Sequence, residues 1–389
     1  MHPNPFSPSF SVHPSLFFGR LEYIRRFEVA LDTQGSADRF FFLTGTRGCG
    51  KTSLLHQYAL RAAERRWDVI EATSSDVLAQ LLHYTGLDMR QSKTRSLGPG
   101  VSVAGAVEVP VGSASSTRET SGSPDLLTPE LCKKLKAQKL QNGLALIVDE
   151  AQKIRRPDIV RIGNAVQQAR TEGLKIALVL GGLPSAYGKI RAYRDCTFLR
   201  RMRREELWCM KKSETIELFR TMVSKVPEIA VAEGQIVSIG QFTGGHPYLL
   251  QLVGDRLYTL VEQIYAPDAG MVVTVTDDLI ERAQQEALGP YKENVLDDVL
   301  AGSHGATRDY IRVALEERDE TGLISVADVN ARFAESAAQM NSHRAYALNT
   351  QVLRKAGRGF LRFALPHFEY AYRETESEEC PDTDDEWLF

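Results

Sequence analysis

Unbroken apolar runs alternate with amphipathic segments over the first half of this chain. The segments RFFFL (39–43) and LALIVDE (144–150) each hold a continuous apolar run, which is typical of a strand buried on both faces of a sheet. In TSLLHQYALRAAERR (52–66) the apolar residues recur three and four positions apart, as on one face of a helix. This alternation predicts a parallel α/β sheet with helices on both faces. Strands are predicted at 39–43, 67–73, 144–150 and 174–182, and helices at 20–31, 52–66, 74–86, 128–140 and 157–171.

The second half is predicted to be mostly helical. After Ser213 the apolar residues keep a helical spacing, apart from a short β-like segment at 271–276. Helices are then predicted near 293–301 and 307–317, followed by a long helix through 341–357 and an alternating, hairpin-like run. Helices followed by a β-ribbon are the order of a winged helix.

Composition divides the chain into five parts. We expect an extended arm at 1–18, an α/β core at 19–211, a helical domain at 212–290, a winged helix at 291–373 and an acidic tail at 374–389. The core contains an insert at 88–128, rich in Gly, Ser, Pro and Val, that forms either a β-hairpin or a disordered loop.

The overall composition is that of a soluble protein. Of the 389 residues, 43% are hydrophobic and 25% are charged, and no apolar run reaches the length of about 18 residues that a membrane span needs. The N-terminus lacks the basic and apolar regions of a signal peptide. The five cysteines have no metal-ligand spacing, which predicts free thiols and a cytoplasmic location.

Charge is distributed unevenly along the chain. The net charge is −3, but residues 374–389 carry eight carboxylates, which leaves about +5 on the remainder. The tail ends in Trp387-Leu388-Phe389. It is predicted to be a solubilising segment, a docking peptide for a protein partner, or a competitor for the protein's own DNA-binding surface.

A glycine-rich loop connects the first predicted strand to the following helix. Its sequence, GTRGCGKT, places four residues between Gly45 and Gly50-Lys51-Thr52, the spacing of a phosphate-binding loop. Glycines allow consecutive backbone N–H groups to point at phosphates, and the helix N-terminus attracts the same anions. We predict that Lys51 bridges the outer phosphates of ATP and that the Thr52 hydroxyl ligates Mg²⁺. The predicted nucleotide contacts are Gly45, Thr46, Arg47, Gly48, Cys49, Gly50, Lys51, Thr52 and Ser53.

Two carboxylates end the buried strand LALIVDE. Asp149 is predicted to hold Mg²⁺, and Glu150 is predicted to polarise the attacking water. Such a pair needs a nearby cation to be stable at the end of an apolar strand, which the phosphate loop and its metal would supply.

These motifs resemble those of one ATPase family. GTRGCGKT, IVDEAQ and GGHPYLLQLVG, with an F-x-G-R segment before the first helix, resemble AAA+ P-loop ATPases of the origin-recognition-like and STAND-adjacent bacterial branch. The resemblance covers about residues 4–373 and implies a P-loop NTPase core, a helical lid at 212–290 and a C-terminal winged helix. It also implies that His246 stands near the position of a lid arginine. The implied adenine-side contacts are Phe18, Gly19, Arg20, Gly245 and Pro247.

The resemblance also implies a catalytic arginine supplied by a neighbouring subunit. The basic cluster Arg200, Arg201, Arg203 and Arg204 occupies the position of this arginine finger, with Arg201 or Arg204 as the catalytic candidates. A solvated basic loop or a phosphate-binding patch is the alternative. The strand at 174–182 ends in two glycines where the family carries a polar γ-phosphate sensor, which predicts slow or assembly-dependent hydrolysis. In ring-forming relatives, hairpins like the 88–128 insert project toward a central channel.

The winged-helix segment is basic. Residues 340–373 contain six Lys or Arg and one Glu, a charge of +5. The predicted DNA contacts are Arg344, Arg354, Lys355, Arg358 and Arg362. Winged helices also dock proteins, so a protein-binding role is the alternative.

Together these features predict an Mg²⁺- and ATP-dependent ATPase that forms homo-oligomers, binds double-stranded DNA and recruits or regulates a protein partner. The resemblance implies a role in replication, transposition or defence against phage. The alternative is a STAND-like signalling switch, in which bound ATP exposes a protein-binding surface and DNA has no part.

Overall fold

The computed structural model describes residues 2–9, 16–87, 126–137, 143–265, 271–301, 303, 305–334, 336–370 and 372. The predictions for residues 88–125 of the insert and for the acidic tail lie outside this part of the chain.

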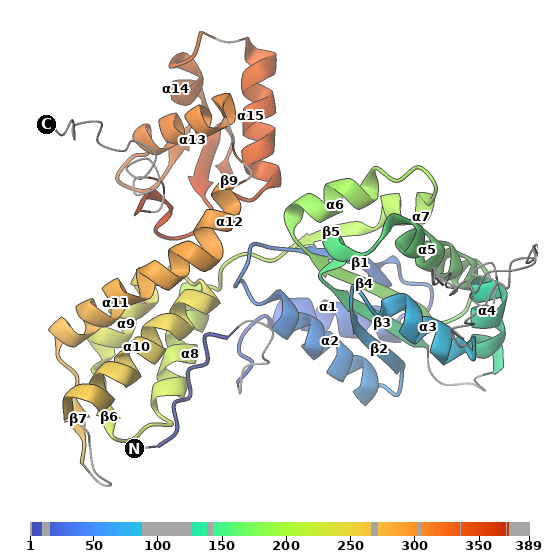
Figure 1. Ribbon diagram of the computed structural model, residues 1–389, viewed down its shortest axis with the longest axis horizontal. Coiled ribbons are helices and arrows are strands. Elements are labelled where there is room, and N and C mark those ends of the chain that lie inside the picture. Colours follow the sequence, from blue (N-terminus) through green and yellow to red (C-terminus); the bar gives the residue numbers. More distant parts are fainter. Residues whose placement is uncertain are drawn as a thin grey trace, which may run out of the picture.

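The core is a parallel sheet of five strands in the order β2-β3-β4-β1-β5 (Figure 1). Every residue of β1 and β4 is buried, as their continuous apolar runs predicted. The strand bounds are β1 Phe40–Thr44, β2 Asp68–Thr73, β3 Leu144–Asp149, β4 Ile176–Gly182 and β5 Arg203–Glu206. The predicted parallel α/β core is confirmed.

Helices cover both faces of this sheet because alternate strand residues point to opposite sides. Phe41 and Leu43 pack against α1 (Leu21–Asp32) and α2 (Lys51–Glu64). Phe40 and Phe42 pack in a second apolar cluster on the other face. The helices of that face are α3 Val77–Thr85, α4 Leu127–Ala137, α5 Arg156–Thr171, α6 Pro184–Arg191 and α7 Thr197–Arg201.

The edge strand β5 consists only of charged residues, Arg-Arg-Glu-Glu. It pairs in parallel with β1, with Arg203 opposite Phe41 and Glu206 opposite Thr44. The sequence predicted only a basic cluster here, because a charged tetrapeptide carries no strand-like hydrophobic pattern. Pairing with a buried neighbour, and ion pairs on both faces, make it a strand.

A helical domain follows the sheet. Its apolar cluster contains residues from the N-terminal arm: Phe6 packs on Phe219 at 5.5 Å between ring centroids and contacts Gly254. The arm therefore lies along these helices, as Figure 1 shows, and not along the sheet. The elements are α8 Lys212–Val223, α9 Glu233–Phe242, α10 Pro247–Tyr265, α11 Asp277–Tyr291 and the paired short strands β6 Ile229–Ala230 and β7 Val273–Thr274.

α11 does not end where the winged-helix segment was expected to begin. The helix continues through one π-helical stretch, Lys292–Leu296, into α12 (Asp297–Leu300). The expected boundary at 290–291 therefore falls within a continuous helical run.

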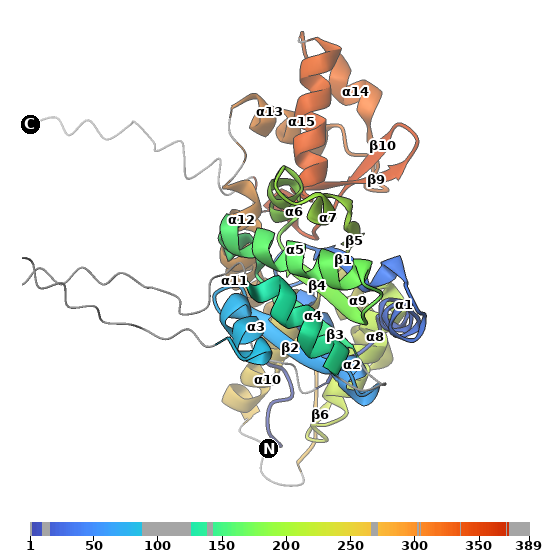
Figure 2. The same cartoon turned by 90° about the vertical axis from the view of Figure 1, so that its right-hand side faces the viewer.

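The last part, here called the C-terminal module (residues 305–372), stands at the top of Figure 2. It contains helices and an antiparallel sheet in the order β8-β10-β9. Its elements are α13 Ala306–Glu316, β8 Ile324–Ser325, α14 Val326–Ala331, α15 Ala337–Asn349, β9 Leu353–Gly357 and β10 Phe360–Phe363.

The long helix predicted through residue 357 is wrong beyond Asn349. Gln351 is buried with a left-handed φ of 60°, and this breaks the helix. Residues 353–357 then form β9, paired with β10. Val352 and Leu353 are fully buried beneath this ribbon, so tertiary packing overrides the helical preference of the segment.

A single apolar cluster runs from the arm through the helical domain into the C-terminal module. It includes Phe6, Leu257, Tyr291 and Leu361. Within the described ranges, no helix is long and apolar enough to cross a membrane. The described cysteines, Cys49, Cys132, Cys196 and Cys209, are unpaired thiols.

Candidate nucleotide-binding site

The glycine-rich loop lies between β1 and α2, as predicted. Gly48 and Gly50 have φ values of 70° and 92°, which residues with side chains rarely adopt. A Cβ on Gly48 would lie 2.6 Å from Cβ of Tyr248 and 2.8 Å from Cε1 of His246, so close packing also excludes a side chain there. Gly50 is the residue from which α2 begins.

The backbone carbonyls of this loop accept hydrogen bonds from four residues in three parts of the chain. Lys51 Nζ donates to Gly45 O at 2.9 Å and to Thr46 O at 2.8 Å. The other donors are the His246 ring to Arg47 O at 3.1 Å, the Tyr248 N–H to Gly48 O at 3.2 Å, and Arg20 Nη2 to Cys49 O at 3.4 Å. With its carbonyls held by these donors, the loop keeps its N–H groups for an anion at the start of α2.

Thr52 and Asp149 meet although 97 residues separate them. The Thr52 hydroxyl donates to Asp149 Oδ2 at 2.5 Å, and the Glu150 N–H donates to Asp149 Oδ1 at 2.7 Å. A hydroxyl and a carboxylate are hard oxygen donors that fit Mg²⁺, which takes few protein ligands and completes its shell with phosphate and water oxygens. No group of three His, Cys, Asp or Glu able to hold a metal occurs among the described residues.

Glu150 follows Asp149 with a left-handed backbone, φ 55°. Its carboxylate is half-buried and pairs with Lys153 Nζ at 3.0 Å. A non-glycine residue in this conformation stores strain, which is frequent at functional positions.

The two glycines that end β4, where the resembling family carries a polar sensor, are closely packed. A Cβ on Gly181 would lie 2.4 Å from Cδ1 of Leu55. A Cβ on Gly182 would lie 2.7 Å from Oε1 of Gln152. A side chain at either position would therefore have to displace Leu55 of α2 or Gln152 of the turn after β3.

His246 does not act as a lid cation. Its Nδ1 accepts from the Leu249 N–H at 3.4 Å, so the proton lies on Nε2, which donates to Arg47 O. Burial lowers the pKa of His246 to about 3, with the charges of Lys51 and Arg20 acting in the same direction. The ring is neutral at neutral pH and holds the loop backbone, whereas a lid arginine would neutralise phosphate.

The N-terminal Gly19-Arg20 pair also reaches the loop. Arg20 is buried, with φ 60°, and its Nη2 donates to Trp208 O at 2.5 Å as well as to Cys49 O. Gly19 packs against Glu214 at the start of α8. Gly245 O accepts from the Met210 N–H at 2.7 Å, and Pro247 lies 4.0 Å from a Cβ built on Gly50. Of the expected adenine-side residues, Arg20 and Pro247 lie at the loop, while Phe18 packs against the apolar cluster of the helical domain.

The two candidate finger residues differ in setting. Arg201 is exposed at the end of α7. Arg204 lies on β5, where its Nε donates to Thr44 Oγ1 at 3.2 Å and its Nη2 pairs with Glu206 Oε1 at 3.1 Å. The arginines of this cluster therefore do not share one environment, because one is exposed to solvent and the other is paired within its own chain.

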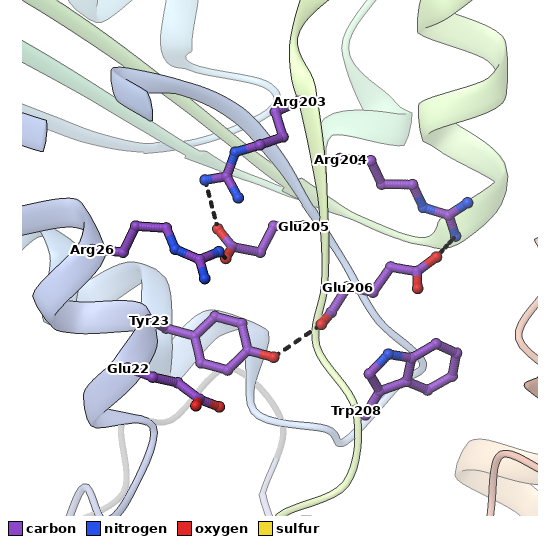
Figure 3. A pocket seen from close by; sticks show the side chains of 8 residues that line it. All are labelled: Glu22, Tyr23, Arg26, Arg203, Arg204, Glu205, Glu206 and Trp208. Atoms are coloured by element: carbon purple, nitrogen blue, oxygen red, sulfur yellow. Dashed lines mark hydrogen bonds and ion pairs between the residues drawn. The ribbon is translucent and has the colours of Figure 1, made fainter. Parts of the chain in front are cut away.

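A pocket beside the edge strand was not anticipated from the sequence. Figure 3 shows Arg203 and Glu205 on the side of α1, and Arg204 and Glu206 on the opposite side of β5. Arg26 Nη1 pairs with Glu205 Oε1 at 2.7 Å. Ion pairs satisfy these charges internally. The pocket is lined by Glu22, Tyr23, Arg26, Arg203, Arg204, Glu205, Glu206 and Trp208.

The predicted DNA contacts lie mainly on the β9–β10 ribbon. Arg354, Lys355 and Arg358 are exposed, and Arg362 is directly opposite Arg354 in the strand register. Like charges directly opposite each other repel, so the ribbon favours an anion above this pair. Arg344, on α15, donates to Asn341 Oδ1 at 2.7 Å and is not part of the ribbon.

The C-terminal module contacts the segments around the nucleotide loop. Pro366 fits against Gly244, and the His367 ring donates to Phe242 O at 2.8 Å. From α12, Asp298 pairs with Arg47 of the loop at 2.8 Å. The loop is therefore joined to the module through both the helical domain and α12.

With this geometry established, the core can be compared with known proteins. Residues 33–190 match the family described as AAA domain. The match covers the larger part of the α/β core. It contains the glycine-rich loop, Asp149, Glu150 and the end of β4.

Solved structures extend the likeness beyond the AAA domain. A Walker-type ATPase of Pyrococcus abyssi matches with 14% identity and a TM-score of 0.59, over 92% of this chain and 96% of that chain. The ORC2 protein of Aeropyrum pernix, in its ADPNP–ADP complexes, matches with 12% identity and a TM-score of 0.55, over 95% and 98%. At these identities the likeness concerns the fold. No curated protein sequence matches the chain.

Proposed function

We propose that the chain is an Mg²⁺-dependent ATPase of the AAA+ class that oligomerises, binds double-stranded DNA through its C-terminal module, and recruits or regulates a protein partner. We place its role in one of three processes: replication, transposition or phage defence. The bacterial origin-recognition-like and STAND-adjacent branch is part of this proposal, as is a cytoplasmic location.

The observation that carries the ATPase proposal is the contact between Thr52 and Asp149 next to Glu150. It joins the phosphate loop to the strand end that would hold Mg²⁺. Bound Mg²⁺ would polarise the γ-phosphate and neutralise developing charge. Lys51 would leave the Gly45 and Thr46 carbonyls for the outer phosphates, and Glu150 would accept a proton from the attacking water.

Oligomerisation is proposed from the arginine cluster. Arg201 is exposed and could reach a γ-phosphate bound by a second subunit, whereas Arg204 is engaged within its own chain. We therefore favour Arg201 as the finger. Arg201→Ala should abolish assembly-dependent turnover while leaving ATP binding intact, and Arg204→Ala is the matched comparison.

DNA binding is proposed for the C-terminal module, which we interpret as a winged helix. Its element order, α13-β8-α14-α15-β9-β10, and its three-stranded antiparallel sheet support this interpretation. The β9–β10 ribbon would be the wing, and its exposed cations would contact phosphates. α15 would be the recognition helix.

The test combines turnover, DNA binding and size. ATPase activity should rise with double-stranded DNA, and DNA affinity should fall as salt rises. Glu150→Gln in ATP should be larger than a monomer in solution. If DNA does not raise the ATPase activity and no salt-dependent DNA binding is found, the DNA role is excluded. If Glu150→Gln remains a monomer in ATP, an arginine finger supplied by a second subunit is excluded.

A second function, a STAND-like ATP-gated switch, is supported by two contacts, one between α12 and the nucleotide loop and one between the C-terminal module and the helical domain. The pairing of Asp298 with Arg47 and the packing of Pro366 on Gly244 would change if nucleotide altered the loop. In this case the module and the acidic tail would bind protein. ATP should then change the scattering profile of the protein more than ADP does, without any effect of DNA.

A further inference from the structure

Gln152 lies between the two strand ends that face the nucleotide loop. It belongs to the single turn Ala151–Lys153 after β3. Its amide nitrogen donates to Glu150 Oε2 at 2.8 Å, and its amide oxygen accepts from the Leu183 N–H at 3.2 Å. One side chain therefore connects the carboxylate that follows β3 to the residue that follows β4.

The space occupied by this amide explains the glycine at the end of β4. A Cβ on Gly182 would lie 2.7 Å from Gln152 Oε1 and 3.3 Å from Cζ of Phe42. Contacts under 3 Å require a shift, and here the shift would displace the amide that holds Glu150. β4 thus carries no polar side chain at its end, and the polar group there comes from Gln152.

Glu150 needs a partner of this kind. Its left-handed backbone is a minority conformation that surrounding contacts must maintain. Lys153 also pairs with Glu150 Oε2, but its side chain is 69% exposed. Of these two partners, Gln152 also bonds to the residue that follows β4, so it connects the Glu150 carboxylate to that strand end. It therefore fixes both the position and the direction of the carboxylate.

We propose that Gln152 is the positioning residue for the catalytic carboxylate and takes the place of the polar residue that β4 lacks. The proposal rests on the hydrolytic function proposed above. Gln152 transfers no proton: the attacking water gives its proton to Glu150, and Gln152 keeps that carboxylate directed at the water. A general base is effective only when it is oriented for the transfer.

The test is the turnover of the full chain with Gln152→Ala. We expect kcat for ATP to fall roughly 10- to 100-fold, because the base is present but no longer fixed. KM and the calorimetric affinity for Mg–ATP should stay within about twofold, because Gln152 makes no contact with the phosphate loop. A merely structural role would instead lower the melting temperature and the affinity together.

A second variant approaches the same contact from β4. Gly182→Ala removes no functional group but would displace the Gln152 amide, so kcat should fall while ATP affinity is kept. Gly188→Ala is the matched control, because a Cβ at that position on α6 meets no atom within 4 Å. When Gln152 is already alanine, adding Gly182→Ala should not lower kcat further, because the amide that it would displace is absent.

Three results overturn the proposal. The first is a Gln152→Ala variant with kcat within twofold of the original chain while Glu150→Gln is inactive. The second is an additive loss in the double variant. The third is an original chain that hydrolyses no ATP with or without DNA, which also removes the proposed function, whereas the first two leave that function standing.

Discussion

The nucleotide loop and the β9–β10 ribbon both present cations, but in opposite settings. Lys51 is buried at 8% exposure and donates to two loop carbonyls, while Arg354, Lys355 and Arg358 project into solvent. The first arrangement suits one small anion in a fixed position. The exposed arrangement suits an extended polyanion, which can bind the ribbon in many alternative positions along its length.

This difference predicts different responses to salt and to mutation. A buried cation is weakly screened, so binding at the loop should depend on single residues. Exposed cations on the ribbon each contribute a modest, salt-dependent part of the affinity. The following predictions test this contrast, from the largest effect to the smallest.

Removal of the loop cation should have the largest effect. Lys51→Ala is expected to weaken Mg–ATP binding by at least about 100-fold, because the β- and γ-phosphates lose their charged partner at a water-poor site. Titration calorimetry measures this, with Lys189→Ala on α6 as the control. If Lys51→Ala binds Mg–ATP as well as the control does, the loop is not the nucleotide site.

Removal of the proposed general base, Glu150, should lower ATP turnover at the nucleotide site without weakening ATP binding there. Glu150→Gln keeps the size of the side chain but cannot accept a proton, so phosphate release should fall about 100-fold while ATP affinity is retained. Glu64→Gln, at the exposed end of α2, is the matched control. Equal turnover in the two variants would assign the base to another residue.

The buried histidine makes stability depend on pH. The pKa of His246 is about 3 in the folded protein and about 6.5 when unfolded, so the unfolded state binds the extra proton between these values. Stability is therefore full above pH 6.5 and is lost as the pH falls, by about 2 kcal/mol from pH 7 to pH 5. Burial lowers the pKa of His367 too, which acts in the same direction.

His246→Gln should flatten this dependence, because glutamine keeps an N–H donor but does not titrate. Urea unfolding at pH 5 and pH 7 measures the effect, and His83→Gln on α3 serves as the control. An unchanged difference between the two pH values in His246→Gln would assign the acid sensitivity to other groups.

The ribbon should show the smallest single effects. Arg354→Ala or Arg362→Ala is expected to weaken DNA binding about tenfold and to lower the slope of log affinity against log salt by about 1 each. Fluorescence anisotropy at several salt concentrations measures both. Arg332→Ala in the same module is the control, because Glu316 and Glu317 already pair its charge. If the slope of log affinity against log salt is the same in all three variants as in the original chain, the ribbon cations do not contribute salt-dependent binding, and the proposed difference between ribbon and loop is wrong.

Much of the core could be predicted from local sequence. Phe40–Leu43 and Leu144–Val148 are continuous apolar runs, and such runs are strands wherever both faces are covered. The glycine-rich loop was equally clear, because its backbone conformation requires glycine at fixed spacing. The closeness of Thr52 and Asp149 followed from two motifs at the ends of β1 and β3, although β4 lies between these strands in the sheet.

Other features carried no local signal. β5 is entirely charged, and the end of α15 is set by the burial of Gln351 and Val352. Nothing in the segment IVDEAQ indicated a special role for Gln152, which follows from its contacts with Glu150 and Leu183. The reason for Gly182 was likewise not visible in the strand to which it belongs.

The sequence by itself determined strands β1 to β4, the loop and the two carboxylates, because each depends on residues within a few positions of one another. Only the tertiary structure decided how the loop is held and why β4 ends in glycine. Those features depend on donors and side chains distant in the chain, such as His246 and Arg47, which are 199 residues apart. Such pairs meet only when the sheet and the helical domain are packed together.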